Sequence, residues 1–192
     1  SPYQAITGSV SEALRLGCSA IGFTMYPGSD SALDMISDIQ ELTAEAKSYG
    51  LAVVIWSYPR GGNITKEGET AIDIVSYAAH MAALIGAHII KVKPPTAYLE
   101  NTEAKMVYEK LNIQINSLSD RIRNVVQSCF NGKRIVVFSG GSSKDTEGLL
   151  KEIKEIYKGG GNGSIIGRNS FQRPKKEALQ LLAQIIDIYK GK

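Results

Sequence analysis

Two lysines stand inside an apolar run of the chain, in the segment IIKVKPP that contains Lys91 and Lys93. A buried ammonium is costly to desolvate, and a lysine beside a second cation has its ammonium form further disfavoured. The free amine that results can attack a carbonyl carbon and form a Schiff base. Alternatively, both side chains extend from a strand end to solvent, and the residues alone give the two interpretations equal weight.

Aromatic and charged side chains gather in a second segment, WSYPRG, which holds Trp56, Tyr58 and Arg60. Alternate residues of a strand share one face, so these side chains can point into the same interior as Lys91 and Lys93. We therefore predict that Tyr58 transfers a proton, with a neighbouring cation favouring its phenolate. The commoner role of such a tyrosine is that of a rim aromatic with a satisfied hydroxyl.

Glycine-rich segments follow the last two expected strands, FSGGSS at 138–143 and IIGRN at 165–169. Backbone N–H groups with little side-chain bulk can bind phosphate, and the last two loops of a barrel commonly do so. Each segment alone is weak evidence, because most glycine loops are turns. Together and in this order they favour a phosphate site.

A short β-branched run followed by an amphipathic helix recurs along the chain. We expect strands at 19–29, 51–62, 87–95, 133–141 and 163–171, and helices at 31–49, 66–85, 115–129, 146–157 and 175–189. This alternation predicts one α/β domain, residues 1–192, with a parallel sheet. A doubly wound open sheet and a (β/α)8 barrel both fit the pattern. The unusual residues at carboxyl ends of strands favour the barrel slightly.

Composition narrows the classes of function. The net charge is only +3, and no basic stripe indicates nucleic-acid binding. No apolar run is long enough to span a bilayer, so we predict no membrane association. The two cysteines and two histidines lack metal-ligand spacing, so no metal site is predicted and a reducing cytosol is expected. A GxGxxG turn after a first strand is absent, which disfavours a nucleotide-binding fold.

Five segments in order resemble the class I fructose-bisphosphate aldolases of the archaeal and bacterial DhnA type: AIGFTMYPGS, VVIWSYPRGG, GAHIIKVKPP, IVVFSGGSS and GSIIGRNSFQRP. The resemblance covers essentially the whole chain and implies a (β/α)8 TIM barrel. It further implies a cytoplasmic homo-oligomer that reversibly cleaves fructose 1,6-bisphosphate to two triose phosphates in glycolysis and gluconeogenesis. The implied chemistry uses a lysine Schiff base, a phosphorylated sugar substrate, and neither metal nor cofactor.

The resemblance also assigns roles to residues. It implies that Lys91 forms the Schiff base, that Tyr58 transfers protons and that Trp56 is an aromatic wall of the site. The positions implied to hold substrate phosphate are Ser139, Gly140, Gly141, Gly167 and Arg168. We also expect Arg60 and Lys93 to bind the substrate or its phosphate.

One departure from the family pattern concerns the first three strands, which include one that ends in a catalytic aspartate. They have no counterpart before Ser1, and about 100 residues of a barrel of typical size are missing. We therefore expect the chain to cover the last five β/α units, with impaired activity if the aspartate is lacking. Two alternatives stay open: a related Schiff-base aldolase or transferase for another phosphorylated ketose, and a catalytically silent fragment that binds sugar phosphate.

Overall fold

The computed structural model describes residues 1–140 and 145–192, which form an α/β fold around one parallel sheet. The strands are β1 (Ala20–Met25), β2 (Ala52–Ser57), β3 (Ile89–Val92), β4 (Ile135–Ser139) and β5 (Gly163–Ile165). They pair side by side in chain order, β1-β2-β3-β4-β5, and every pairing is parallel. This order confirms the predicted arrangement of parallel neighbours. It excludes a doubly wound sheet, in which the strand order would reverse.

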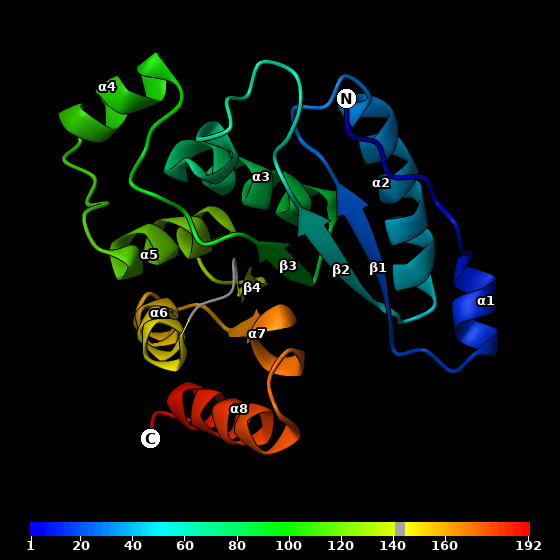
Figure 1. The fold of residues 1–192 in the computed structure, drawn as a ribbon. Coiled ribbons are helices and arrows are strands. Elements are labelled where there is room, and N and C mark those ends of the chain that lie inside the picture. The colour runs from blue at the N-terminus through cyan, green and yellow to red at the C-terminus, as the bar shows by residue number, and fades with distance from the viewer. Residues whose placement is uncertain (141–144) are drawn as a thin grey trace.

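Helices cover one side of the sheet in an arc (Figure 1). The helices of the described chain are α1 (Val10–Arg15), α2 (Ala32–Ser48), α3 (Ile72–Ile85), α4 (Thr102–Lys110), α5 (Leu118–Ser128), α6 (Thr146–Lys158), α7 (Arg168–Phe171) and α8 (Lys175–Tyr189), with a 3₁₀ turn η1 (Gly68–Thr70). The larger helices pack on their neighbours along the arc, α2 on α3, α3 on α5, α5 on α6 and α6 on α8. In the described part of the chain, no helix combines the length and apolar character needed to cross a membrane.

Local sequence explains where the main helices begin and end. Gly50 and Gly86 follow α2 and α3 in left-handed conformations, with φ of 78° and 111°, which a side chain would disfavour. Ser117 and Asp120 form a reciprocal capping box at the start of α5. Asp145 caps α6 by accepting a hydrogen bond from the backbone N–H of Gly148. The predicted starts of α6 and α8 agree with the structure.

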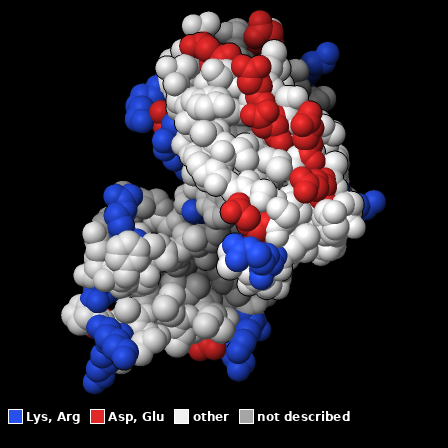
Figure 2. Space-filling model, turned by 90° about the vertical axis from the view of Figure 1, so that its right-hand side faces the viewer, with Lys and Arg blue, Asp and Glu red and all other residues white. Residues whose placement is uncertain are grey.

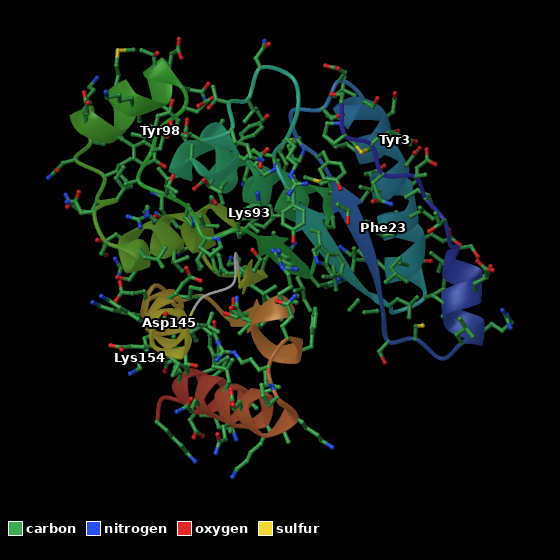
Figure 3. All side chains as sticks on the ribbon, viewed as in Figure 1. Tyr3, Phe23, Lys93, Tyr98, Asp145 and Lys154 are labelled. Carbon is green, nitrogen blue, oxygen red and sulfur yellow. The ribbon has the colours of Figure 1, made fainter. Side chains whose placement is uncertain are left out.

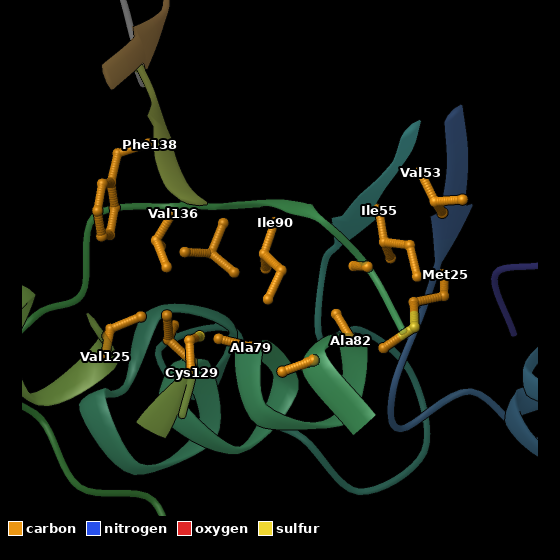
Figure 4. Packing of buried hydrophobic residues seen from close by; sticks show 14 of the residues in the cluster. Met25, Val53, Ile55, Ala79, Ala82, Ile90, Val125, Cys129, Val136 and Phe138 are labelled. Carbon is orange, nitrogen blue, oxygen red and sulfur yellow. The ribbon is translucent and has the colours of Figure 1, made fainter. Parts of the chain in front are cut away.

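The hydrophobic core lies between the sheet and the arc of helices (Figure 4). Along β2, Val53 and Ile55 are fully buried against the helices, whereas alternate residues are only partly buried on the other face. Ile90 and Val136 continue the buried row on β3 and β4. Burial of each such side chain stabilises the fold by about 1.5–3 kcal/mol. This row therefore determines which face of the sheet packs against the helices and which face carries Lys91.

The outer face of α2 is acidic. Its exposed residues include Asp34, Asp38, Glu41 and Glu45, and Figure 2 shows a band of acidic side chains over this part of the surface. The buried residues Met35 and Ile39 lie on the opposite side of the same helix. The helix is therefore amphipathic, with one apolar face packed on the core and one charged face in solvent.

Several predicted boundaries were wrong. The helix expected at 66–85 begins only at Ile72, because Ala71 is extended and forms a bridge with Thr96 of the loop after β3. The strand expected at 163–171 ends at Ile165, and the chain turns there into α7, where Ser170 N–H donates to the Gly167 carbonyl. The connection between β3 and α5 also contains α4, an amphipathic helix that buries none of its residues.

Candidate active site

A row of paired residues crosses the free face of the sheet. The register places Thr24 beside Trp56, Trp56 beside Lys91, and Lys91 beside Val137. Neighbours in a parallel register point to the same face, so the indole and the lysine side chain lie together. The Lys91 Nζ atom is 5.8 Å from the centre of the Trp56 ring system and 5.9 Å from that of the Tyr58 ring.

Lys91 is partly buried in this row, and burial lowers the pKa of its ammonium below the ordinary value. Within the described residues it forms no ion pair. The sequence prediction that a second cation would add to the lowering was wrong. Burial is the only cause of the lowering, and the expected second cation, Lys93, is paired with a carboxylate, which offsets its charge.

Tyr58 follows β2 and continues the ladder, its backbone N–H donating to the Met25 carbonyl at 3.0 Å. Burial raises the pKa of its phenol, and the opposing effect of the Arg60 guanidinium is smaller. The Arg60 cation does favour the phenolate, as expected, but desolvation outweighs it and the net shift of the pKa is upward. At neutral pH the Tyr58 hydroxyl carries its proton.

Arg60 lies between two aromatic rings. Its guanidinium carbon is 5.8 Å from the centre of the Tyr58 ring and 6.0 Å from that of the Tyr26 ring at the end of β1. The Arg60 Nε atom is buried and has no hydrogen-bond partner within the described residues, with Glu69 Oε2 3.7 Å away. Stacking therefore holds the guanidinium while its outer part stays accessible.

Glu69, on η1, is a site residue that sequence reasoning missed. Its Oε2 atom is 3.1 Å from the Nζ atom of Lys93, and its Oε1 atom is 2.9 Å from that of Lys66. Lys93 follows β3 and lies near the centre of the molecule in Figure 3. The segment TKEGET resembles an ordinary polar turn, so nothing local indicated that its last acid meets a lysine 24 residues later.

One cavity of about 690 Å³ joins the predicted groups at the carboxyl ends of β2 to β5. Its lining includes Tyr58, Arg60, Lys91, Lys93, Ser139, Gly140, Gly167 and Arg168. The two glycine segments thus converge on the same space as the lysines. Trp56 is not part of the lining and lies against Lys91 and Gly22 instead. Gly141, also predicted to hold phosphate, lies outside the described residues.

Asn169 connects the two glycine segments and was not singled out from the sequence. Its side chain is 3% exposed, and its Nδ2 atom donates to the Gly140 carbonyl at 3.0 Å. Arg173 Nε in turn donates to the Asn169 carbonyl at 2.7 Å, and Arg173 also donates to the Thr146 hydroxyl at the start of α6. This chain of bonds fixes the end of β4 relative to α7.

Neither histidine belongs to the site. His88 Nδ1 accepts from the Val53 N–H at 3.0 Å, and His80 Nδ1 lies 2.7 Å from the Ser128 carbonyl. Across the described ranges, no group of three His, Cys, Asp or Glu residues is placed to hold a metal ion.

Comparison with known proteins agrees with this geometry. Residues 3–173 match the family described as DeoC/LacD family aldolase. The class 1 fructose-bisphosphate aldolase of Thermoproteus tenax is 33% identical over 193 residues, which cover 100% of this chain and 63% of that protein. The probable class 1 fructose-bisphosphate aldolase of Chlamydia muridarum is 34% identical, over 97% of this chain and 56% of that protein. The chain thus spans roughly three fifths of these relatives.

Solved structures show the same relationship. The crystal structure of an archaeal fructose 1,6-bisphosphate aldolase superposes with a TM-score of 0.81 at 31% identity, covering 100% of this chain and 66% of that chain. A second archaeal aldolase structure, with its catalytic lysine covalently bound to a carbinolamine intermediate of the substrate, superposes with a TM-score of 0.79 at 30% identity, over 98% of this chain and 64% of that one. The five parallel strands therefore align with part of the aldolase barrel.

Proposed function

The chain belongs to the DeoC/LacD family of aldolases, and we propose that it supplies the Schiff-base lysine and the phosphate-binding groups of a metal-independent fructose-bisphosphate aldolase. The observation that carries this proposal is the environment of Lys91. Its amine is desolvated beside Trp56 and Tyr58, and it faces a cavity that also contains two glycine-rich strand ends. An amine with a lowered pKa and a proposed phosphate site in one cavity suit a phosphorylated ketose.

In the proposed reaction, the Lys91 amine adds to the ketose carbonyl carbon, and the carbonyl oxygen leaves as water. The resulting iminium accepts the electron pair of the carbon–carbon bond two positions away when the hydroxyl proton beyond that bond is removed. An aldehyde then departs, the enamine is protonated on carbon, and water releases the ketone and the lysine. Tyr58 is the proposed donor of the proton to the enamine carbon, because its ring centre lies 5.9 Å from the Lys91 Nζ atom and its hydroxyl is protonated at neutral pH.

Substrate phosphate is proposed to bind where β4 and β5 end. Arg168 offers a guanidinium, Ser139 a hydroxyl and Gly167 a backbone N–H group without a bulky side chain. The N–H of Gly140 already donates to the Ile165 carbonyl at 3.2 Å, so its proposed role is to leave space for the phosphate. Arg60, after β2, and Lys93, after β3, line the same cavity and are proposed to bind the far end of the substrate. Cations after β2 and β3 and a further cation after β5 support a substrate with two phosphates.

A second candidate substrate class comes from another relative. The Methanocaldococcus jannaschii protein named fructose-bisphosphate aldolase/6-deoxy-5-ketofructose 1-phosphate synthase is 30% identical over 88% of this chain and 47% of that protein. The same lysine chemistry could transfer a three-carbon unit to another phosphorylated ketose. The proposed roles of Lys91 and Tyr58 are the same in both reactions.

Borohydride trapping tests the proposal. The protein is mixed with dihydroxyacetone phosphate, treated with borohydride, and its intact mass is measured. We expect the mass of one reduced adduct, and far less adduct with the same concentration of dihydroxyacetone, which lacks phosphate. Equal trapping of the two compounds would contradict the phosphate site. No adduct with either compound would contradict the Schiff base and favour a silent sugar-phosphate binder.

A further inference from the structure

Two lysines on one face, Lys91 and Lys93, line the same cavity, but the groups that surround their amines differ. Lys91 lies against aromatic rings, whereas Lys93 is bound to a carboxylate. We propose that Glu69 determines which lysine is the nucleophile, by holding Lys93 as an ion-paired ammonium and leaving Lys91 as the reactive amine. This inference rests on the proposed Schiff-base function and names a residue that positions, rather than contacts, the reacting atoms.

The geometry of Glu69 suits this role. Its side chain is 13% exposed, and its Oε2 atom is 3.1 Å from the Nζ atom of Lys93, whose side chain is 28% exposed. The η1 turn that carries it is held on both sides. Ala71 bridges to Thr96, and Gly68 packs so closely on the Glu100 carboxylate that a side chain there would collide with it. The carboxylate therefore has little freedom to leave Lys93.

The local charges favour an ionised Glu69. Burial raises the pKa of its carboxyl, but hydrogen bonds from Lys66 and Lys93 and their charges together outweigh burial, so the pKa is lowered. Arg60 adds a third cation, with its Nε atom 3.7 Å from Glu69 Oε2. The rings of Trp56 and Tyr58 lie beside Lys91. The charged and titratable residues that line the same cavity as Lys91 are Tyr58, Arg60, Lys93, Glu152 of α6 and Arg168 of α7.

The chemical consequence follows from the form that an amine needs in order to react. An ammonium has no lone pair and cannot add to a carbonyl, and an adjacent carboxylate favours the ammonium. Lys93 has such a carboxylate beside it, because its Nζ atom donates to Glu69 Oε2 at 3.1 Å. Lys91 has a pKa lowered by burial and no ion pair among the described residues. Removing the Glu69 charge should reduce the difference in reactivity between Lys91 and Lys93.

Reductive methylation measures the reactivity of each amine without the sugar substrate. Formaldehyde condenses with a neutral amine, water leaves, and cyanoborohydride delivers hydride to the iminium carbon to give an N-methyl group. At limiting reagent, peptide mass spectrometry compares the parent with Glu69→Gln. We expect the methylation rate of Lys93 to rise about tenfold, the effect of losing one close opposite charge.

Two further variants separate charge from structure. Glu67→Gln removes an exposed carboxylate two residues away and should leave Lys93 as unreactive as in the parent. Glu69→Asp keeps the charge and should also keep Lys93 unreactive. Equal Lys93 rates in the parent, Glu69→Gln and Glu67→Gln would overturn the inference, as would a tenfold rise in Glu69→Asp.

A second experiment uses the sugar phosphate. With dihydroxyacetone phosphate and borohydride, Lys91→Met should trap nothing, whereas Lys91→Met combined with Glu69→Gln should gain an adduct on Lys93. A double variant without this adduct, alongside a parent that traps on Lys91, would overturn the inference alone. A parent that traps nothing, while Lys93 methylation still rises in Glu69→Gln, would refute the proposed function and support the charge arrangement.

Discussion

The Lys91 Nζ atom lies 5.8 Å from the centre of the Trp56 ring system, and the two residues are direct partners in the register of β2 and β3. The indole in turn lies over Gly22 of β1, where a Cβ atom would collide with it. A large aromatic side chain thus shields one side of the amine. This arrangement contributes to the partial burial of Lys91 on the face of the sheet opposite the hydrophobic core.

The pH dependence of trapping should reflect the lowered pKa of Lys91. The free-amine fraction grows as pH rises through the pKa, so trapping with dihydroxyacetone phosphate should become faster with pH and then level off. Because burial lowers this pKa, the midpoint should lie below that of an ordinary lysine, about 10.4. Trapping rates measured from pH 6 to 11 test this. A midpoint at or above the ordinary value would contradict the proposed effect of burial.

Tyr58→Phe should separate imine formation from proton transfer. The variant keeps the ring near Lys91 but loses the hydroxyl, so the borohydride adduct should still form. Cleavage of fructose 1,6-bisphosphate, measured in a form of the protein that turns it over, should slow by about 10²–10⁴. Tyr26→Phe is the matched control, because Tyr26 stacks on the same Arg60 but does not line the cavity. Equal cleavage rates in the two variants would remove Tyr58 from the mechanism.

Gly22→Val should displace the indole and expose Lys91. Trp56 is the only tryptophan, so the intrinsic fluorescence reports on this position alone. We expect a red-shifted emission and less trapping. Gly8→Val is the control, since a Cβ atom there meets nothing within 4 Å. Unchanged emission in Gly22→Val would show that the indole does not occupy this space.

Asn169→Asp should loosen the connection between the two glycine segments. It removes the amide donor to the Gly140 carbonyl and places a negative charge near the proposed phosphate site. Affinity for inorganic phosphate, measured by calorimetry, should fall about tenfold, the effect of one buried hydrogen bond. Gln172→Glu adds the same charge at an exposed position of the same segment and should bind phosphate nearly as well as the parent. Similar losses in both variants would indicate a general charge effect.

Much of this arrangement was predictable because it depends on local periodicity. The alternation of buried and free residues in WSYPRG and IIKVK places Trp56, Tyr58 and Lys91 on one face once the strands are known to be parallel neighbours. The helices with clear amphipathic repeats, such as α8, were also predictable.

The remaining features depend on contacts between distant segments. The ion pair of Glu69 with Lys93 requires the η1 turn and its bridge to the loop after β3, and no local pattern indicates either. The direction of the Tyr58 pKa depends on a balance between burial and the Arg60 charge, which composition cannot give. The short helix α7 begins at Arg168, three residues after β5 ends, and Ile166 prolongs the apolar run beyond the strand, so the strand was predicted too long.

Location of the trapped adduct tests the central claim most directly. The parent, Lys91→Met and Lys93→Met are treated with dihydroxyacetone phosphate and borohydride, and the modified residue is identified by peptide mass spectrometry. We expect an adduct on Lys91 in the parent and in Lys93→Met, and none in Lys91→Met. An adduct on Lys93 in the parent, or an undiminished adduct in Lys91→Met, would contradict the claim.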